Sequence, residues 1–387
     1  QATKLAPDNA EPYYNLGLTF RDMGAFDKAA TNFSRAIEIK PDYAEAYEKL
    51  GNAFANLNQL DQAIDCQSKA IALKPEYFLA HFSLGLFLNN RGDIPASLQS
   101  YRRALELDPG QEPVRARILS GKRKLCDWTA EPGIEESWEQ LSTEGQSINP
   151  FVSLCMDDDP ERQRRRTENW LEMEDASRKQ ALAAPSALPA KSETRPEKLR
   201  IGYFSSDFAD HAVSYLISGL LREHDRSRFE IHAYSYGKTP PEKHREALGA
   251  YVDGFTDIRN LSKSGIVDTV RAHKLDIAID LNGHTRFSHT DLFAFRLAPI
   301  QINYLGYPGT IGADFMDYIV ADPVLIPEQY RDCYTENVIY LPDSFLPNDD
   351  RRAIAVTDTS RADFGLPENG FVFCCFNNLS KISPAEF

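Results

Sequence analysis

Three segments near the middle of the chain place polar residues, of kinds that move protons or bind small polar ligands, directly after apolar runs. Each run has the length and the composition of a β-strand. The segments are Ser205-Ser206-Asp207, Asn282-Gly283-His284-Thr285 and Leu305-Gly306-Tyr307-Pro308-Gly309-Thr310. Ligands of parallel α/β sheets bind at the carboxyl ends of the strands, so these three exits are candidates for one shared site.

His211 lies four residues after Asp207, where a helix is expected to begin. A helix N-terminus disfavours the charged imidazolium, which favours a neutral ring that accepts a proton near pH 7. Asp207 is near enough to orient that ring or to act as a base itself. Equally, Asp207 or Asp210 could cap the helix, with His211 only solvated. The spacing alone does not decide between these interpretations.

Other residues of these segments carry weaker signals. His284 could contact a sugar or a phosphate, although ordinary turn chemistry explains Asn-Gly equally well. The string GYPGTIG offers backbone N–H groups to a phosphate or a carbonyl group, but one glycine-rich turn is weak support. Lys381 follows a strand pattern near the end of the chain and could neutralise a leaving diphosphate, although a lone lysine is usually a surface charge.

Several chemistries are disfavoured by the motifs. The remaining histidines, at positions 81, 224, 232, 244, 273 and 289, lack metal-ligand spacing, and the six cysteines are irregularly spaced. No metal or other cofactor is therefore expected. The sequence contains neither a P-loop nor a G-x-S-x-G elbow, which argues against P-loop nucleotide hydrolysis and α/β-hydrolase chemistry.

The elements that must position these residues alternate between strands and helices. LRIGYFSSDF, FEIHAYSYG, LDIAIDLNG, PIQINYLGY, DYIVAD and NVIYLP predict six strands, and helical segments separate several of them. Apolar strands alternating with helices predict a parallel sheet covered on both faces, a Rossmann-like lobe over residues 197–350. A second lobe is expected to begin within 351–387, at GFVFCCFNNLSK, where the sequence ends.

A 34-residue repeat precedes this lobe. Proline recurs at 7, 41, 75 and 109, and glycine at 17, 51 and 85. Gly24, Asn58 and Gly92 fall at the expected turns, where a left-handed residue is needed. The pattern is that of tetratricopeptide repeats, about three of them over residues 1–110, forming an α-solenoid that binds proteins or peptides or serves as a scaffold. Residues 111–196 are expected to hold closing helices and a linker.

Composition narrows the class of partner and the compartment. The formal net charge of −14 over 387 residues argues against nucleic acid or an anionic membrane surface as a partner. There is no apolar run of about 18 residues and no signal-peptide pattern. Few cysteines in a long chain indicate a reducing compartment, and the expected location is cytoplasmic. The chain is expected to be a piece of a longer protein.

Several strings together resemble the O-linked N-acetylglucosamine transferases, including their bacterial and Spindly-like branch. They are IGYFSSDFADHAVSYL, LNGHT, RLAPIQINYLGYPGTIGADFMDYIVAD and FNNLSKISP, downstream of the repeats. The resemblance implies an inverting, metal-independent glycosyltransferase of the two-lobed GT-B type. It would transfer N-acetylglucosamine from UDP-GlcNAc to Ser or Thr hydroxyls of protein or peptide acceptors that the repeats present.

The resemblance also assigns roles to residues. Asp207 and His211 match the active-site acid and histidine, and Lys381 matches the lysine that stabilises the departing diphosphate. Leu305, Gly306 and Asn378 match positions near the donor. Asp210, Ser214, Asn282 and His284 are expected to bind the donor or the acceptor at the same edge of the sheet. His211 and Lys381 are expected to face each other across the nucleotide sugar.

Departures from the animal members leave alternatives open. Asp210-His211-Ala212 stands where animal members have Asn-His-Pro, and FNNLSKI is closer to the Spindly branch, whose plant members transfer fucose from GDP-fucose. The wider bacterial group favours N-acetylglucosamine. A non-catalytic tetratricopeptide adaptor and a transferase acting on glycans or lipids are the other hypotheses. The chain as it stands is expected to be inactive, because most of the second lobe would lie beyond Phe387.

Overall fold

The computed structural model of the chain describes residues 7–131, 139–143, 146–154, 158–182, 196–237, 248–285, 287–351 and 358–372. These residues form two compact units, one within 7–141 and the other within 142–372. Each unit has its own hydrophobic clusters. No helix in the described part of the chain combines the length and hydropathy that crossing a bilayer requires.

The first unit is a stack of helices in which each packs against the next. Its helices are α2 (Ala10–Asp22), α3 (Phe26–Ile39), α4 (Ala44–Asn56), α5 (Leu60–Leu73), α6 (Phe78–Arg91), α7 (Ile94–Leu107) and α8 (Glu112–Lys124). The second helix of each pair ends two residues before the recurring proline, which cannot continue a helix. The prediction of a tetratricopeptide solenoid is confirmed.

The recurring glycines explain why the helix pairs pack so closely. A Cβ at Gly17 would lie 2.6 Å from the ring of Phe33, and one at Gly85 would lie 2.5 Å from the ring of Tyr101. The turn positions behave as the sequence predicts, because φ is +72° at Gly24, +62° at Asn58 and +95° at Gly92. Left-handed backbone at this period is what glycine and asparagine tolerate best.

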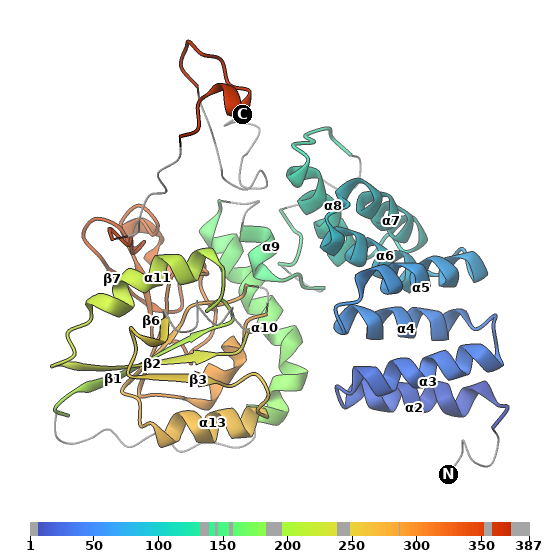
Figure 1. Cartoon of the computed structure of the whole chain (residues 1–387), viewed down its shortest axis with the longest axis horizontal. Coiled ribbons are helices and arrows are strands. Elements are labelled where there is room, and N and C mark those ends of the chain that lie inside the picture. The colour runs from blue at the N-terminus through green and yellow to red at the C-terminus, as the bar shows by residue number, and fades with distance from the viewer. Residues whose placement is uncertain are drawn as a thin grey trace. The chain divides into compact units, whose positions relative to one another are not determined.

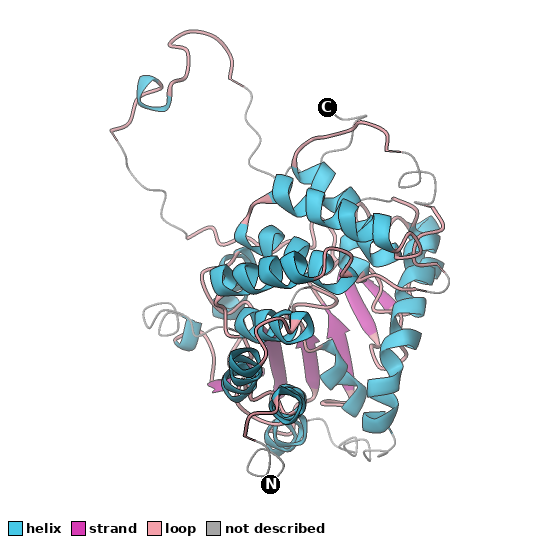
Figure 2. Ribbon diagram, turned by 90° about the vertical axis from the view of Figure 1, so that its right-hand side faces the viewer, coloured by secondary structure: helices cyan, strands magenta, loops and turns pink. Residues whose placement is uncertain are grey.

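The second unit is built on a seven-stranded parallel sheet whose strands lie side by side (magenta in Figure 2). The strands are β1 (Leu199–Ser205), β2 (Phe229–Ser235), β3 (Gly254–Asp257), β4 (Ile277–Asp280), β5 (Ile300–Asn303), β6 (Tyr318–Ala321) and β7 (Asn337–Tyr340). Their order is β3-β2-β1-β4-β5-β6-β7, and every neighbouring pair is parallel. The Rossmann-like prediction is confirmed, with one addition. The sequence patterns do not predict β3, which begins with glycine and ends with aspartate, residues depleted in strands.

Helices cover both faces of this sheet. Alternation along β1 sends Tyr203 to one face and Phe204 to the other. Helix α11 (Ala212–Glu223) packs Ile217 and Leu221 on the Tyr203 side, and α13 (Lys263–Ala272) packs Val270 on the Phe204 side. Figure 1 shows the two helices on opposite sides of the strands. The core is therefore two apolar layers, as a parallel sheet requires.

The region 111–196, expected to connect repeats and sheet, contributes to both units. Helix α8 packs on α7, whereas α9 (Pro150–Leu154) packs on α10 (Pro160–Leu182), which contacts η1 (Thr290–Phe295) and η2 (Glu328–Cys333). At the other end, the described residues 358–372 contain one short 3-10 helix, η3 (Ala362–Phe364). The expected start of a second lobe at GFVFCCFNNLSK falls mostly outside the described residues and stays a prediction.

Candidate functional site

The candidate site lies where the sheet changes direction of winding. β1 has β2 on one side and β4 on the other, so the connections leaving β1 and β4 diverge. In open α/β sheets such a switch point leaves a crevice at the carboxyl ends of the strands. Ser205-Ser206-Asp207 leaves β1 here, and Leu281-Asn282 leaves β4. The predicted strand exits are thus neighbours in space.

Asn282 joins the two strand ends through its side chain. Its Oδ1 accepts hydrogen bonds from the backbone N–H of Ser206 at 2.8 Å and from the Tyr236 hydroxyl at 2.9 Å. Its Nδ2 donates to Ser206 Oγ at 2.9 Å and to Asp207 Oδ2 at 2.7 Å. The side chain is fully buried. Asn282 therefore supports Asp207 from inside the protein, and its predicted contact with a ligand stays a prediction.

Asp207 and His211 face each other at the edge of the site. Asp207 Oδ2 lies 3.7 Å from His211 Nδ1, and the side chains are 22% and 50% exposed. Asp207 Oδ1 accepts a hydrogen bond from Ser206 Oγ at 3.0 Å. Both carboxylate oxygens thus have a protein donor, while the imidazole remains open to solvent. The structure thus brings these two residues together, and their catalytic roles stay predictions.

His211 is also the N-cap of α11. Its Nδ1 accepts the backbone N–H of Val213 at 3.3 Å, and its backbone is extended, with φ −148° and ψ 151°. A neutral ring that accepts at Nδ1 carries its proton on Nε2 and cannot accept another there. A ring that instead carries its proton on Nδ1, 3.7 Å from Asp207 Oδ2, leaves Nε2 free as a base. The interpretation that Asp207 or Asp210 caps this helix is wrong, because His211 itself is the cap, and its role as a base stays a prediction.

Two buried groups that the sequence patterns do not single out support this edge. Tyr236 follows β2 and packs edge-to-face on His289, with ring centres 4.9 Å apart. Asp280, the last residue of β4, accepts the backbone N–H of Asn282 at 2.9 Å and lies 2.7 Å from the Thr290 hydroxyl. Burial raises the pKa of Asp280. The one sequence signal for Tyr236 is the alternation Tyr234-Ser235-Tyr236, which places the two tyrosines on the same face of the sheet.

The exit of β5 contains a strained turn. Leu305 has a φ of +74°, and the backbone N–H of Gly306 donates to the carbonyl of Tyr304 at 3.0 Å, which closes a three-residue turn. Turns of this kind are rare because a side chain disfavours positive φ. A Cβ at Gly306 would lie 2.0 Å from the carbonyl oxygen of Leu281, so the exits of β4 and β5 touch.

The loop that follows is held by buried polar groups. His284 is 3% exposed; its Nε2 lies 3.0 Å from the carbonyl oxygen of Ile311. Glu336 accepts the Thr310 hydroxyl and the Ile311 backbone N–H, each at 2.6 Å. Burial raises the pKa of Glu336. His284 and Glu336 thus fix the backbone of the GYPGTIG string, and contact of His284 with a ligand stays a prediction.

The remaining predicted residues divide into three groups. Asp210 is exposed and accepts the Tyr215 hydroxyl at 2.6 Å. Ser214 is fully buried in the first turn of α11. Asn378 and Lys381 lie outside the described residues, so the predicted opposition of His211 and Lys381 stays a prediction. Within the described ranges, no cluster of three or more His, Cys, Asp or Glu is arranged to hold a metal ion.

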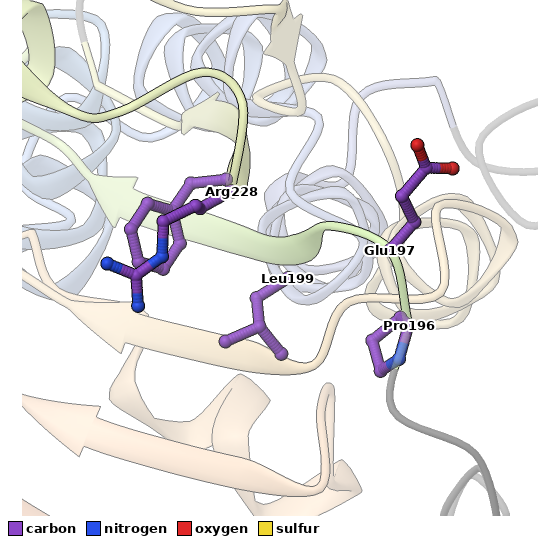
Figure 3. Close-up of a pocket in the computed structure, with 5 residues that line it drawn as sticks. Pro196, Glu197, Leu199 and Arg228 are labelled. Atoms are coloured by element: carbon purple, nitrogen blue, oxygen red, sulfur yellow. The ribbon is translucent and has the colours of Figure 1, made fainter.

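A pocket of about 260 Å³ lies at the opposite edge of the sheet (Figure 3). It is lined by Pro196, Glu197, Leu199, Arg228 and Phe229. Leu199 and Phe229 are the first residues of β1 and β2, so this pocket is at the amino ends of the parallel strands. Ligand sites of such sheets lie at the carboxyl ends, so the site above, not this pocket, is the candidate.

Comparisons with known proteins agree with both units. Residues 176–357 match Glycosyl transferase family 41, and residues 17–58 and 48–112 match tetratricopeptide repeat families. The α/β unit is therefore that of a glycosyltransferase. More specifically, residues 176–357 are similar to family 41, and the resemblance to O-linked N-acetylglucosamine transferases is confirmed.

Three relatives and structures illustrate the match. The chain is 37% identical over 205 residues to the probable UDP-N-acetylglucosamine–peptide N-acetylglucosaminyltransferase SEC of Arabidopsis thaliana, covering 52% of this chain and 21% of that protein. It is 34% identical over 197 residues to the probable transferase SPINDLY of the same plant, covering 49% and 21%. A mutant O-GlcNAc transferase of Thermobaculum terrenum aligns with a TM-score of 0.58 and 25% identity, over 97% of this chain and 64% of that one. The chain thus spans about a fifth of the length of these two curated relatives.

Proposed function

We propose that the protein, at its full length, is an inverting glycosyltransferase that transfers N-acetylglucosamine from UDP-GlcNAc to serine or threonine hydroxyls of other proteins. The match of residues 176–357 to family 41 carries this proposal, because that segment contains the Asp207–His211 pair. The names of the plant relatives SEC and SPINDLY specify UDP-N-acetylglucosamine as donor and a peptide as acceptor. The repeats present the acceptor protein, since stacked helix pairs form extended binding surfaces.

The proposed reaction needs a base on one side of the sugar and charge stabilisation on the other. The acceptor oxygen attacks the anomeric carbon as the bond to the diphosphate breaks, and the hydroxyl proton passes to the protein. His211 Nε2 takes this proton when Nδ1–H faces Asp207, or the Asp207 carboxylate takes it directly. Lys381 and backbone N–H groups stabilise the negative charge that builds on UDP.

Metal independence is part of the proposal. The carboxylates at the carboxyl ends of the strands accept hydrogen bonds from the protein. Asp207 accepts from the side chains of Ser206 and Asn282, and Asp280 accepts from the backbone N–H of Asn282. Hydrogen bonds from the protein thus hold these carboxylates in place without a cation. Sugar transfer is therefore expected to continue undiminished in excess EDTA, and loss of transfer that added Mg²⁺ or Mn²⁺ restores would contradict this part.

One experiment tests the donor and the enzyme class together. Full-length protein is incubated separately with UDP-GlcNAc and GDP-fucose and with cellular protein, and intact-mass analysis identifies the added sugar. A gain of one N-acetylhexosamine from UDP-GlcNAc is expected, with His211→Ala as the matched inactive control. Transfer from GDP-fucose alone would instead support the Spindly-like alternative. Absence of transfer from either donor would favour the non-catalytic adaptor.

A further inference from the structure

A chain of hydrogen bonds runs from the core of the sheet to the Asp207 carboxylate, which faces the exposed imidazole of His211. The Tyr236 hydroxyl bonds Asn282 Oδ1 at 2.9 Å, Asn282 Nδ2 bonds Asp207 Oδ2 at 2.7 Å, and that same oxygen lies 3.7 Å from His211 Nδ1. Tyr236 and Asn282 are buried, whereas half of the His211 side chain is exposed. The two buried residues therefore cannot touch the acceptor, but they contact the group that faces His211.

The direction of these hydrogen bonds is fixed by the groups around Asn282. The backbone N–H of Ser206 can only donate, so it requires the oxygen and not the nitrogen of the Asn282 amide. Tyr236 supplies the second donor to that oxygen, because its own oxygen faces the backbone N–H of His289. Burial and the Asp280 carboxylate raise the pKa of Tyr236, so its hydroxyl keeps the proton that it donates. Asn282 is thereby held with Nδ2 toward Asp207.

His211 Nδ1 has two mutually exclusive partners. It can accept the Val213 N–H at 3.3 Å, which puts the proton of the neutral ring on Nε2. Alternatively it can carry the proton itself and, after a small movement that shortens the 3.7 Å separation, donate to Asp207 Oδ2, which leaves Nε2 able to accept. We infer that Tyr236 and Asn282 are positioning residues that hold Asp207 in front of Nδ1 and so select the form of His211 that acts as a base. This inference rests on the proposed sugar transfer.

The variant Tyr236→Phe tests the inference with little change in packing, because the ring and its contact with His289 remain. In the full-length protein, kcat for sugar transfer is expected to fall about tenfold, since small errors in the position of a catalytic group are costly. KM for the nucleotide sugar should stay within about twofold, because Asp207 and His211 are on the acceptor side. The matched control is Tyr234→Phe. Tyr234 is a fully buried tyrosine on β2 whose hydroxyl lies 2.6 Å from His273 Nδ1. It should leave kcat unchanged.

A second measurement on the whole chain does not depend on activity. Long-range ¹H–¹⁵N correlations of ¹⁵N-histidine-labelled protein report which ring nitrogen of His211 carries the proton. Tyr236→Phe is expected to shift His211 toward the Nε2-protonated form, and Tyr234→Phe is not. An unchanged His211 tautomer in Tyr236→Phe would overturn the inference, as would an equal loss of kcat in both variants.

A second variant tests the inference if Tyr236→Phe does not fold. Ser206→Ala removes the hydroxyl that bonds the other oxygen of Asp207 and should shift the His211 tautomer in the same direction by a smaller amount. No shift in Ser206→Ala would then overturn the inference. If wild-type protein transfers no sugar, the proposed function fails, whereas the ring measurement still decides whether Tyr236 and Asn282 control His211.

Discussion

The side-chain amide of Asn282 donates a hydrogen bond to Asp207 Oδ2 at 2.7 Å, although 75 residues separate them in sequence. The bond joins the ends of two neighbouring parallel strands, β1 and β4. It also makes the position of Asp207, and through it the environment of His211, depend on a residue that solvent does not reach. The packing of the α/β unit and the position of Asp207 are therefore coupled at this contact.

Asn282→Asp should destabilise the α/β unit in a pH-dependent way. The new carboxylate would lie about where Nδ2 is now, against Asp207, and two adjacent carboxylates repel when both are ionised. We expect a loss of roughly 2–4 kcal/mol in the free energy of unfolding at pH 7.5 and a smaller loss at pH 4.5, where one carboxyl holds a proton. Urea denaturation at the two pH values measures this. The exposed Asn260→Asp is the control; an equal effect of both changes would refute the coupling.

Two substitutions of His211 separate capping from catalysis. His211→Ala removes both the cap and the imidazole, whereas His211→Asn keeps a good capping side chain. We expect both variants to lose at least about tenfold in turnover, because a general base contributes about 10²- to 10⁴-fold. Only the alanine variant should lose stability, by about 1 kcal/mol. Steady-state kinetics and thermal unfolding check the pair, and full turnover in a folded variant would remove His211 from the mechanism.

Asp280→Asn should alter how stability depends on pH. Burial raises the pKa of Asp280, so the folded chain binds this proton more tightly than the unfolded chain does. Its contribution to the free energy of unfolding is therefore complete below about pH 4 and is lost as pH rises through the higher folded pKa. The variant has no such proton, so its stability relative to wild type should increase from pH 4 to pH 8, by about 1.4 kcal/mol per unit of raised pKa. Paired urea titrations across that range test the sign.

Gly306→Ala should be strongly destabilising. The added Cβ would lie 2.0 Å from the backbone oxygen of Leu281, and a backbone atom between two paired strands cannot move aside easily. A loss of about 3 kcal/mol or more in the free energy of unfolding is expected, at the upper end of the range for overpacked cores. Gly249→Ala, where a Cβ meets nothing within 4 Å, is the matched control and should be near neutral. Similar effects in the two variants would contradict the close approach of the β4 and β5 exits.

The architecture follows from periodicities that the sequence displays openly. The 34-residue spacing of Gly17, Gly51 and Gly85 predicts the helix pairs because only a residue without a Cβ permits such close crossing. The strands are predictable because parallel strands buried on both faces are continuous apolar runs. β3 lacks such a run and is defined by its pairing with β2, which local patterns do not contain.

The site is predictable only in part. Strand exits indicate Asp207 and His211, because polar residues after apolar strands gather at one edge. The tertiary contacts of Asn282, His284 and Ser214 cannot be predicted from the sequence. A polar side chain is the same residue in the sequence whether it binds a ligand or another part of the protein. Glu336 lies 26 residues from Thr310, and only the packed structure brings them together. Tyr236 is hidden for the same reason.

The strained turn at Leu305 determines when the conformational cost of this part of the site arises. A leucine at φ +74° keeps that conformation only because its surroundings leave no alternative, with Gly306 pressed against the backbone of β4. The free-energy cost of the positive φ at Leu305 therefore arises during folding and does not recur each time a ligand binds. Under the proposed sugar transfer, the binding energy of the substrate would therefore not be spent on forming this turn.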